Sequence, residues 1–418
     1  MSPKVLVISN TALHTGNSNG RTLGLLLSGI PKENLMQFCI KDGSISAELV
    51  REAYCISDAM VLKGMLKSKL LSKKLQPDDG TASAGSGQGE VAGKNGFKFA
   101  MRELVWGIKL GSTDFLQRAL DFNPDVILFQ IGHSGFLADL AVKLAQGCKA
   151  KLVAFTTEDY YLKKWNFLQP NKRSLTFNLY IAKYRKAIRS AMSMTELCIA
   201  NTPALAVCYA RDFGVKTAVI MAAASDSVAA CYEKQENTVV YAGNLTLNRY
   251  RSIIEIAKLV AKADPAAEVA VYGKTTPEIE TEFKKCGNIS VKGFVSYDVL
   301  MPRIANARLL LHCESFDEFY RKDLNAAFST KIADCLASGV PLLLYAPEEF
   351  AETRYLEQEA CAIVCTDEAQ LQSGVAKALT DDPLRFSVAK KAKQIAKQNH
   401  SLESNQKKMF KLLVSVMN

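Results

Sequence analysis

Residues 326–345, AAFSTKIADCLASGVPLLLY, combine a short helix with an apolar run behind it. Ser329 or Thr330 is suited to cap the start of the helix, and Gly339 is suited to end it in a left-handed conformation. The run PLLLY at 341–345 has the composition of a buried strand. A capped helix that leads into a buried strand is the repeating unit of α/β proteins.

The polar residues of this helix share one face. Lys331, Asp334 and Ser338 fall at i, i+3 and i+7, and apolar residues cover the opposite face. A lysine at a helix N-terminus with a carboxylate one turn later is suited to hold a ligand. An ordinary solvated helix face is the alternative, so the rest of the chain must decide between the two.

Composition limits the class of protein. The chain has 418 residues, enough for about two to three domains, and its hydrophobic content of 48% excludes global disorder. No apolar run approaches the roughly 20 residues that cross a bilayer. The first residues, MSPKVLVISN, lack a signal pattern, so we expect a cytoplasmic protein.

Cysteine and histidine give little support to a metal site. The chain has 11 cysteines and four histidines, all scattered, and it contains no C-x-x-C. Such cysteines are typical of small core residues in a reducing compartment. A zinc site is therefore not predicted.

The formal net charge of +10 suggests that the protein binds an anionic partner. Positive charge gathers in residues 63–74 and 163–189, which could attract anionic lipid, phosphorylated substrates or nucleic acid. No helix-turn-helix, RRM or KH signature is present, which argues against nucleic acid. A merely solvated basic face is the other interpretation.

Strand-like runs alternate with amphipathic segments along most of the chain, which predicts parallel sheets with helices on both faces. The pattern starts again after residue 237, so we predict two doubly wound, Rossmann-like domains facing across a cleft. The runs are 5–9, 126–131, 151–155, 196–200 and 217–221 in the first half, and 238–242, 268–272, 308–312, 341–345 and 361–364 in the second.

The predicted first domain spans residues 1–225 and includes a flexible Gly/Ser/Ala-rich insertion at 76–96. The second spans residues 226–395. The C-terminal helix, 396–418, is expected to join the first domain.

Ligands of open α/β sheets lie beyond the carboxyl ends of the strands. In the first half, Gly16 and Gly20 follow the first strand in a loop that does not match G-x-G-x-x-G. His133 follows the run at 126–131, and Glu158 with Asp159 follows the run at 151–155. His133 could equally be a structural hydrogen-bonding group, and the acid pair could cap the next helix or act as a base.

The second half places cations after its strands. Arg249 begins a helix after the strand at 238–242, and Lys274 follows the strand at 268–272. With Lys331 and its helix N-terminus, an arginine in this place would form a credible diphosphate cradle. Asp334 could accept hydrogen bonds from ribose hydroxyls.

The ordered series VVYAGNL, VYGK, VKGFVSYDVLMPRIANARLLLHCES and FSTKIADCLASGVPLLLY resembles the GT-B glycosyltransferases, namely the retaining, nucleotide-sugar-dependent family four. ELCIANTPALAVCYARDFGV, at 196–215, is similar to the last strand and helix of that family's N-terminal domain. Bacterial enzymes of capsule, O-antigen and exopolysaccharide assembly are the most similar group. The resemblance covers nearly the whole chain.

The resemblance implies that the C-terminal domain binds the nucleotide sugar and the N-terminal domain binds the acceptor. It implies that Arg249 and Lys331 contact the donor diphosphate, with Ser329 and Thr330 at the same helix start. Gly293 and Phe294 would lie by the base, Asp334 would bind the ribose, and His133 would contact the donor sugar. Gly16 and Gly20 match the N-terminal loop near donor phosphate and acceptor, and Lys274 is a further donor-binding candidate. His133, Glu158 and Asp159 are the candidate catalytic residues.

One position departs from the family pattern. The first acid of the family's E-x7-E motif falls on Ala326, and the second is Asp334. The first acid usually touches the donor sugar. Glu314, Glu318 or Asp323 could supply a carboxylate from the preceding loop.

The resemblance implies transfer of a sugar from a nucleoside diphosphate sugar to a hydroxyl of a glycan acceptor, which we expect to be lipid-linked, at the inner face of a membrane. No cofactor is expected, and no metal, because no D-x-D follows a strand. The alternatives are a non-catalytic nucleotide-sugar-binding protein, which Ala326 motivates, and a nucleotide-sugar 2-epimerase of the same fold.

Overall fold

The computed structural model describes residues 2–13, 18–46, 48–77, 95–157, 160–163, 165–169, 172–224, 236–326 and 328–417. The chain folds into two compact units. Unit 1 contains residues 1–221 and 403–418, and unit 2 contains residues 222–402. The predicted boundaries lie at residues 225 and 395.

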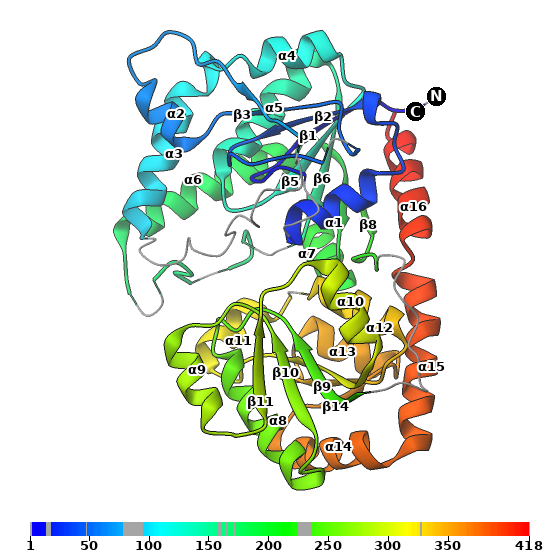
Figure 1. Ribbon diagram of the computed structural model, residues 1–418. Coiled ribbons are helices and arrows are strands. Elements are labelled where there is room, and N and C mark those ends of the chain that lie inside the picture. The colour runs from blue at the N-terminus through cyan, green and yellow to red at the C-terminus, as the bar shows by residue number, and fades with distance from the viewer. Residues whose placement is uncertain are drawn as a thin grey trace. The chain divides into compact units, whose positions relative to one another are not determined.

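Unit 1 is built on an eight-stranded sheet with the order β4-β3-β2-β1-β5-β6-β7-β8 (Figure 1). All neighbours are parallel except β4, which pairs antiparallel with β3. The strands are β1 (Val5–Ile8), β2 (Leu35–Cys39), β3 (Glu52–Cys55), β4 (Lys73–Lys74), β5 (Val126–Ile131), β6 (Lys151–Thr156), β7 (Thr195–Ala200) and β8 (Thr217–Val219).

Every residue of β1 and β5 is buried, as expected for central strands with helices on both faces of the sheet. The helices of unit 1 are α1 (Ser18–Leu27), α2 (Asp58–Lys63), α3 (Gly96–Lys109), α4 (Phe115–Phe122), α5 (Gly135–Cys148), α6 (Leu175–Met192), α7 (Pro203–Phe213) and α16 (Leu402–Ser415), with 3-10 turns at Lys32–Asn34 and Leu110–Ser112.

Unit 2 is built on a parallel six-stranded sheet with the order β11-β10-β9-β12-β13-β14. Its strands are β9 (Glu236–Ala242), β10 (Glu268–Tyr272), β11 (Ile289–Gly293), β12 (Ala307–Cys313), β13 (Leu342–Tyr345) and β14 (Ile363–Cys365). Its helices are α8 (Arg249–Ala263), α9 (Pro277–Lys284), α10 (Tyr297–Ala305), α11 (Glu318–Leu324), α12 (Thr330–Ser338), α13 (Ala351–Gln358), α14 (Glu368–Thr380) and α15 (Asp382–Asn399).

Alternate residues of these strands form the core of unit 2. Val239 and Tyr241 of β9 point with Leu309 and Leu311 of β12 toward one side, where α8, α9 and α14 pack against them. Because successive strand residues point to opposite faces, the intervening apolar residues serve the other side of the sheet. This alternation explains why the strands read as continuous apolar runs.

The two ends of unit 2 are tied together. The Ala224 N–H donates to the His400 carbonyl oxygen at 2.9 Å, and His400 Nδ1 lies 2.8 Å from the Ala222 carbonyl oxygen. His400 is fully buried and ends α15, which packs against α12. The following helix, α16, returns to unit 1, where Gln406 bonds to the Leu25 carbonyl oxygen of α1.

The helix predicted from residues 326–345 is α12, with Ser329 at its N-cap and Gly339 at its C-cap in the left-handed region, at φ 78°. Ser329 makes no side-chain capping bond, so that part of the prediction is wrong. The polar face is not solvated either, because Asp334 and Ser338 are buried. Ser338 bonds to the Cys335 carbonyl oxygen and accepts the Val340 N–H, which closes the turn into β13.

In the part of the chain that the structure describes, no helix combines the length and the apolar character needed to span a bilayer.

Candidate functional site

Three glycine turns stand side by side at the carboxyl edge of the unit 2 sheet. Gly243, after β9, donates its N–H to the Tyr272 carbonyl oxygen at 2.9 Å, and Gly273, after β10, donates to the Gly293 carbonyl oxygen at 2.9 Å. A Cβ on Gly273 would collide with the carbonyl oxygen of Gly243. Glycine is therefore required here, because the backbones of neighbouring turns touch.

Lys274 and Phe294 lie together on the rim of these turns. Gly293 has φ 74°, in the left-handed region, and it directs the chain from β11 toward α10. The Phe294 ring is 56% exposed, and Lys274 Nζ lies 5.5 Å from its centroid. The structure therefore brings together three of the predicted donor-binding residues.

Arg249 begins α8 and faces the end of β12. Its Nε lies 2.7 Å from Glu314 Oε2, and both side chains are largely buried. Burial by itself would lower the pKa of Arg249, but attraction to the carboxylate of Glu314 outweighs burial, and the pKa is raised. Burial raises the pKa of Glu314, and Arg249 offsets only part of that rise.

Lys331, in the first turn of α12, is a second cation near Arg249. Burial lowers its pKa, and repulsion by Arg249 lowers it further. The positive charge at this point is thus only partly compensated by protein carboxylates. An anion bound between the two side chains would relieve the repulsion and would also meet the N-terminus of the nine-residue helix α12.

Asp334 lies one turn further along α12 and is buried. The hydroxyl of Tyr297, at the start of α10, donates to Asp334 Oδ1 at 2.8 Å. This bond joins α12 to the helix that follows Gly293 and Phe294, so the base-side and phosphate-side halves of the predicted site are linked.

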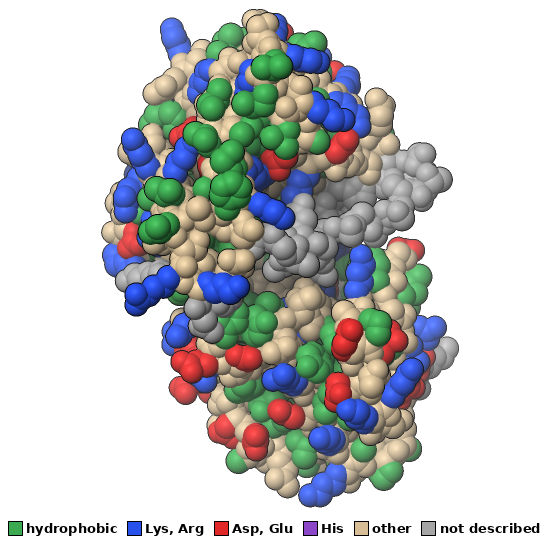
Figure 2. Space-filling model, turned by 90° about the vertical axis from the view of Figure 1, so that its left-hand side faces the viewer, with side chains coloured by type: hydrophobic (Ala, Val, Ile, Leu, Met, Phe, Trp, Pro, Cys, Tyr) green, Lys and Arg blue, Asp and Glu red, His purple; other side chains and the backbone are tan. Residues whose placement is uncertain are grey.

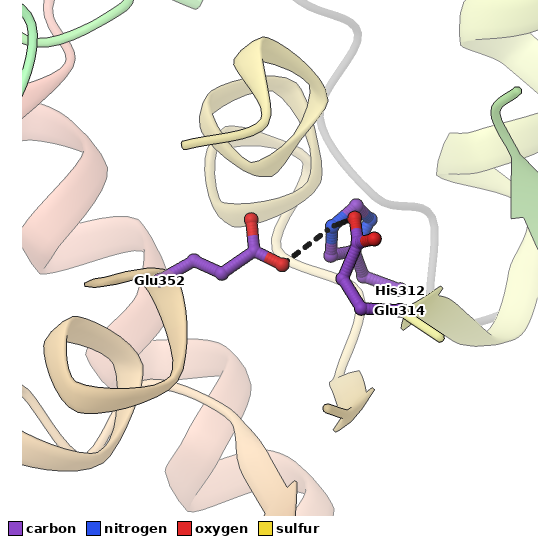
Figure 3. Close-up of side chains that lie close together, drawn as sticks. All are labelled: His312, Glu314 and Glu352. Carbon is purple, nitrogen blue, oxygen red and sulfur yellow. Dashed lines mark hydrogen bonds and ion pairs between the residues drawn. The ribbon is translucent and has the colours of Figure 1, made fainter. Parts of the chain in front are cut away.

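His312, Glu314 and Glu352 form a buried cluster that contacts both Arg249 and the start of α12 (Figure 3). Figure 3 shows Glu352 reaching from α13 toward the imidazole, with Glu314 beside the ring. His312 Nε2 lies 3.2 Å from Glu352 Oε1 and 3.6 Å from Glu314 Oε1. Glu352 Oε2 accepts the Ser329 N–H at 3.2 Å, so a carboxylate caps α12 in place of the expected hydroxyl.

These three side chains have the residue types of a metal site, and their ligand atoms lie within 4.8 Å of one another. Each carboxylate, however, already has a partner, namely Arg249 for Glu314 and the Ser329 N–H for Glu352. Burial opposes the Glu352 charge, but His312 and Ser329 hold the pKa of Glu352 below its usual value. Both carboxylates of the cluster are therefore engaged by protein groups in this structure.

In unit 1, His133 stands between β5 and α5 at the carboxyl edge of the sheet. Its carbonyl oxygen accepts the Tyr180 hydroxyl at 2.7 Å, and its ring lies 5.5 Å from that of Phe99 and 5.9 Å from that of Tyr160. The next residue, Ser134, bonds to Asn10 of the loop after β1 at 2.7 Å. His133 is thus held in a fixed, partly buried turn.

Glu103 is a buried acid that sequence reasoning missed. It reaches from α3 to accept the N–H groups of Gly135 and Phe136, at 2.7 and 3.0 Å, at the start of α5. Burial raises the pKa of Glu103 to about 7, although these N–H groups, Arg102 and Lys183 oppose the shift. It is therefore a positioning group behind the His133 turn.

The remaining candidates are placed as follows. Gly20 is the third residue of α1 and is buried, whereas Gly16, Glu158 and Asp159 lie outside the described residues. Thr330 is the first residue of α12.

The acids proposed to replace the carboxylate missing at Ala326 differ in position. Glu318 is 89% exposed and pairs with Lys322, whereas Glu314 is buried beside Arg249. The side chain of Asp323 lies outside the described residues. Of these candidates, Glu314 is therefore the one that contacts Arg249.

Comparison with known proteins agrees with this geometry. Residues 251–411 match the family model described as glycosyl transferase-like. This segment begins in α8, contains Lys331 and Asp334, and ends in α16. No curated protein sequence matches the chain significantly.

Solved structures similar to the whole chain include the Anabaena protein HepE in complex with UDP and glucose, with 15% identity, 99% of this chain and 100% of that chain covered, and a TM-score of 0.64. A sucrose-phosphate synthase from Thermosynechococcus elongatus has 12% identity, coverage of 99% and 98%, and a TM-score of 0.62. WaaG, a glycosyltransferase involved in lipopolysaccharide biosynthesis, has 14% identity, coverage of 98% and 99%, and a TM-score of 0.58.

These neighbours have the GT-B fold, so the predicted class of two Rossmann-like α/β domains is confirmed. At these identities the likeness defines the fold. What the chain does must be argued from its site.

Proposed function

We propose that this protein is a glycosyltransferase that takes a sugar from a nucleoside diphosphate sugar and transfers it to a hydroxyl of a glycan acceptor. The observation that carries the proposal is the pair of half-buried cations, Arg249 at the start of α8 and Lys331 in the first turn of α12. Repulsion by Arg249 adds to the burial that lowers the pKa of Lys331, and a diphosphate bound between the two cations would relieve that repulsion.

The surrounding residues have matching roles in this proposal. Lys274 would add a further contact to phosphate, and Phe294 with the Gly293 turn would lie beside the base. Asp334 and Tyr297 would face the ribose. The match of residues 251–411 to the glycosyl transferase-like model covers the elements that carry most of these residues.

In the transfer, the bond between the anomeric carbon and the phosphate oxygen breaks, and a bond from the acceptor oxygen to that carbon forms. The electron pair of the broken bond leaves with the nucleoside diphosphate, and the acceptor proton passes to the leaving phosphate or to solvent. Arg249, Lys331 and the α12 N-terminus would stabilise the charge on the leaving group. Glu314 holds Arg249 in place for this task.

The proposal also covers the stereochemistry, the acceptor and the residues of unit 1. Retention of configuration rests on the family resemblance, since Ala326 stands where the first acid of the motif is expected. A lipid-linked acceptor in surface polysaccharide assembly, as in capsule or O-antigen synthesis, is supported by that resemblance and by the likeness to WaaG. His133, with Glu158 and Asp159, is proposed to serve the transferred sugar and the acceptor.

A thermal-shift series with UDP-, GDP-, ADP-, CMP- and dTDP-sugars tests donor binding. We expect the sugar nucleotides of one base to raise the melting temperature of the wild type and to have little effect on that of Lys331→Met. Lys285→Met, at an exposed position, is the matched control and should respond like the wild type. Stabilisation by none of the five would remove the basis of the proposal. Binding without hydrolysis or transfer, over a panel of acceptors, would instead favour a non-catalytic nucleotide-sugar-binding protein.

A further inference from the structure

Helix α3 of unit 1 is apolar on two sides, and only one of them is covered. Phe97, Met101, Leu104 and Ile108 are spaced by four, three and four residues, so they form a stripe along one face, and each is between 41% and 59% exposed. On the other side Trp106 is buried. An exposed stripe of large apolar side chains on a helix marks a surface that is covered in use.

Neighbouring elements extend this stripe. Lys109 Nζ bonds to the Lys67 carbonyl oxygen at 2.8 Å, which brings the segment with the fully exposed Leu66 to the end of α3. At the start of α3, Gly96 lies against the backbone of Phe177 in α6, which fixes that end of the helix. The α3 stripe and Leu66 together are called the apolar patch below.

The border of the apolar patch is basic. Lys63, Lys67 and Lys69 are exposed, and no carboxylate in the described part of the chain lies within ion-pair distance of them. Of the two acids on α2 and α3, Asp58 is bonded to Arg102, and Glu103 is buried. The sequence from residue 160 to residue 195 contains no acid at all.

Figure 2, which looks onto this side of the molecule, shows apolar side chains among many Lys and Arg on unit 1, with few acidic side chains between them. A second copy of this chain would bring two basic borders together, which opposes pairing through this face. Nucleic acid would satisfy the lysines but leave the leucines and Ile108 in water. A surface with anionic headgroups above an apolar layer satisfies both kinds of side chain.

We propose that the apolar patch docks unit 1 on an anionic lipid surface. The α3 stripe lies at the boundary between headgroups and acyl chains, and Lys63, Lys67 and Lys69 extend to the headgroups. The basic segments alone had suggested anionic lipid, and α3 adds the apolar contact that holds the protein there. The proposal goes beyond the transfer reaction and does not depend on it.

Co-sedimentation with vesicles tests the docking. We expect the wild type to bind vesicles of phosphatidylcholine mixed with phosphatidylglycerol and to remain in solution with phosphatidylcholine alone. Leu104→Glu and Ile108→Glu should each lower the partition coefficient about tenfold or more, because an apolar side chain is lost from the layer. Lys63→Gln/Lys67→Gln should lower it about fivefold for each lysine.

Matched controls lie in unit 2. Phe386 is 62% exposed on α15, and Lys258 and Lys262 are exposed on α8, so Phe386→Glu and Lys258→Gln/Lys262→Gln should bind vesicles like the wild type. Equal binding by Leu104→Glu and the wild type would overturn the proposal. So would a dimer, seen by analytical ultracentrifugation, that Leu104→Glu dissociates while neither form binds vesicles.

Discussion

Replacing Lys331 and replacing Arg249 should have opposite effects on stability although both should weaken donor binding. Lys331→Met removes a charged contact to diphosphate, worth about 1.5–3 kcal/mol, so the donor Kd should rise about 10- to 150-fold. Its pKa is lowered in the folded protein by burial and by Arg249, so at neutral pH its charge costs folding free energy. The variant should therefore be as stable as the wild type or more stable.

Arg249→Met leaves Glu314 buried without its partner and close to Glu352. Loss of one member of a buried ion pair costs about 3–5 kcal/mol, which should appear as faster hydrogen exchange of the β9 and β12 amides. Adding Glu314→Gln should restore much of that protection without restoring donor affinity, as isothermal titration would show. Equal destabilisation by Lys331→Met and Arg249→Met, or unchanged affinity in Lys331→Met, would refute the assignment of the two cations to the diphosphate.

Four further results are expected. Donor affinity should fall as pH rises through the lowered pKa of Lys331. Binding at a pH above that pKa should take up protons, because the bound diphosphate raises the pKa of Lys331 again, and calorimetry in buffers of different ionisation enthalpy would detect the uptake. The pKa of Glu103 is raised to about 7 from an ordinary 4.5, so unit 1 should lose about 3 kcal/mol of stability as the pH rises from 4.5 to 7. Glu103→Gln should abolish that loss, as urea titrations followed by the fluorescence of Trp106 and Trp165 would show. Gly273→Ala should destabilise unit 2 by about 1–3 kcal/mol, measured by calorimetry, because its Cβ meets the neighbouring turn. Chelation by EDTA should leave donor binding unchanged, whereas a loss reversed by a divalent cation would assign a metal to the cluster around His312.

Much of the sheet framework could be predicted from sequence because its central strands are apolar throughout. The runs at 126–131 and 268–272 coincide with β5 and β10. The strands missed in unit 1 carry polar residues. In β2, Gln37 interrupts the apolar pattern but is buried, since it bonds to Ser9 and to the Leu13 N–H. The two lysines of β4 form the sheet edge, where local sequence carries no strand signal.

The candidate site divides in the same way. Arg249 and Lys331 could be predicted because position after a strand or at a helix start places them at the sheet edge. Glu352 and Glu103 could not be predicted, because their contacts exist only in the folded chain. Glu352 caps α12 at a residue 23 positions away in sequence, and Glu103 caps α5 at a residue 32 positions away. The position of Asp334 on the helix could be predicted, but its bond to Tyr297 could not, because that bond depends on packing between α10 and α12.

The hydrogen bond between Ala224 and His400 also has a topological consequence. Because residues 222–402 form one unit whose ends are joined, while residues 403–418 return to the other, the second unit is an inserted domain. Domains with adjacent ends are the ones that tolerate excision and transplantation. The nucleotide specificity proposed for this chain is thus encoded in a module that could be exchanged at two neighbouring cuts.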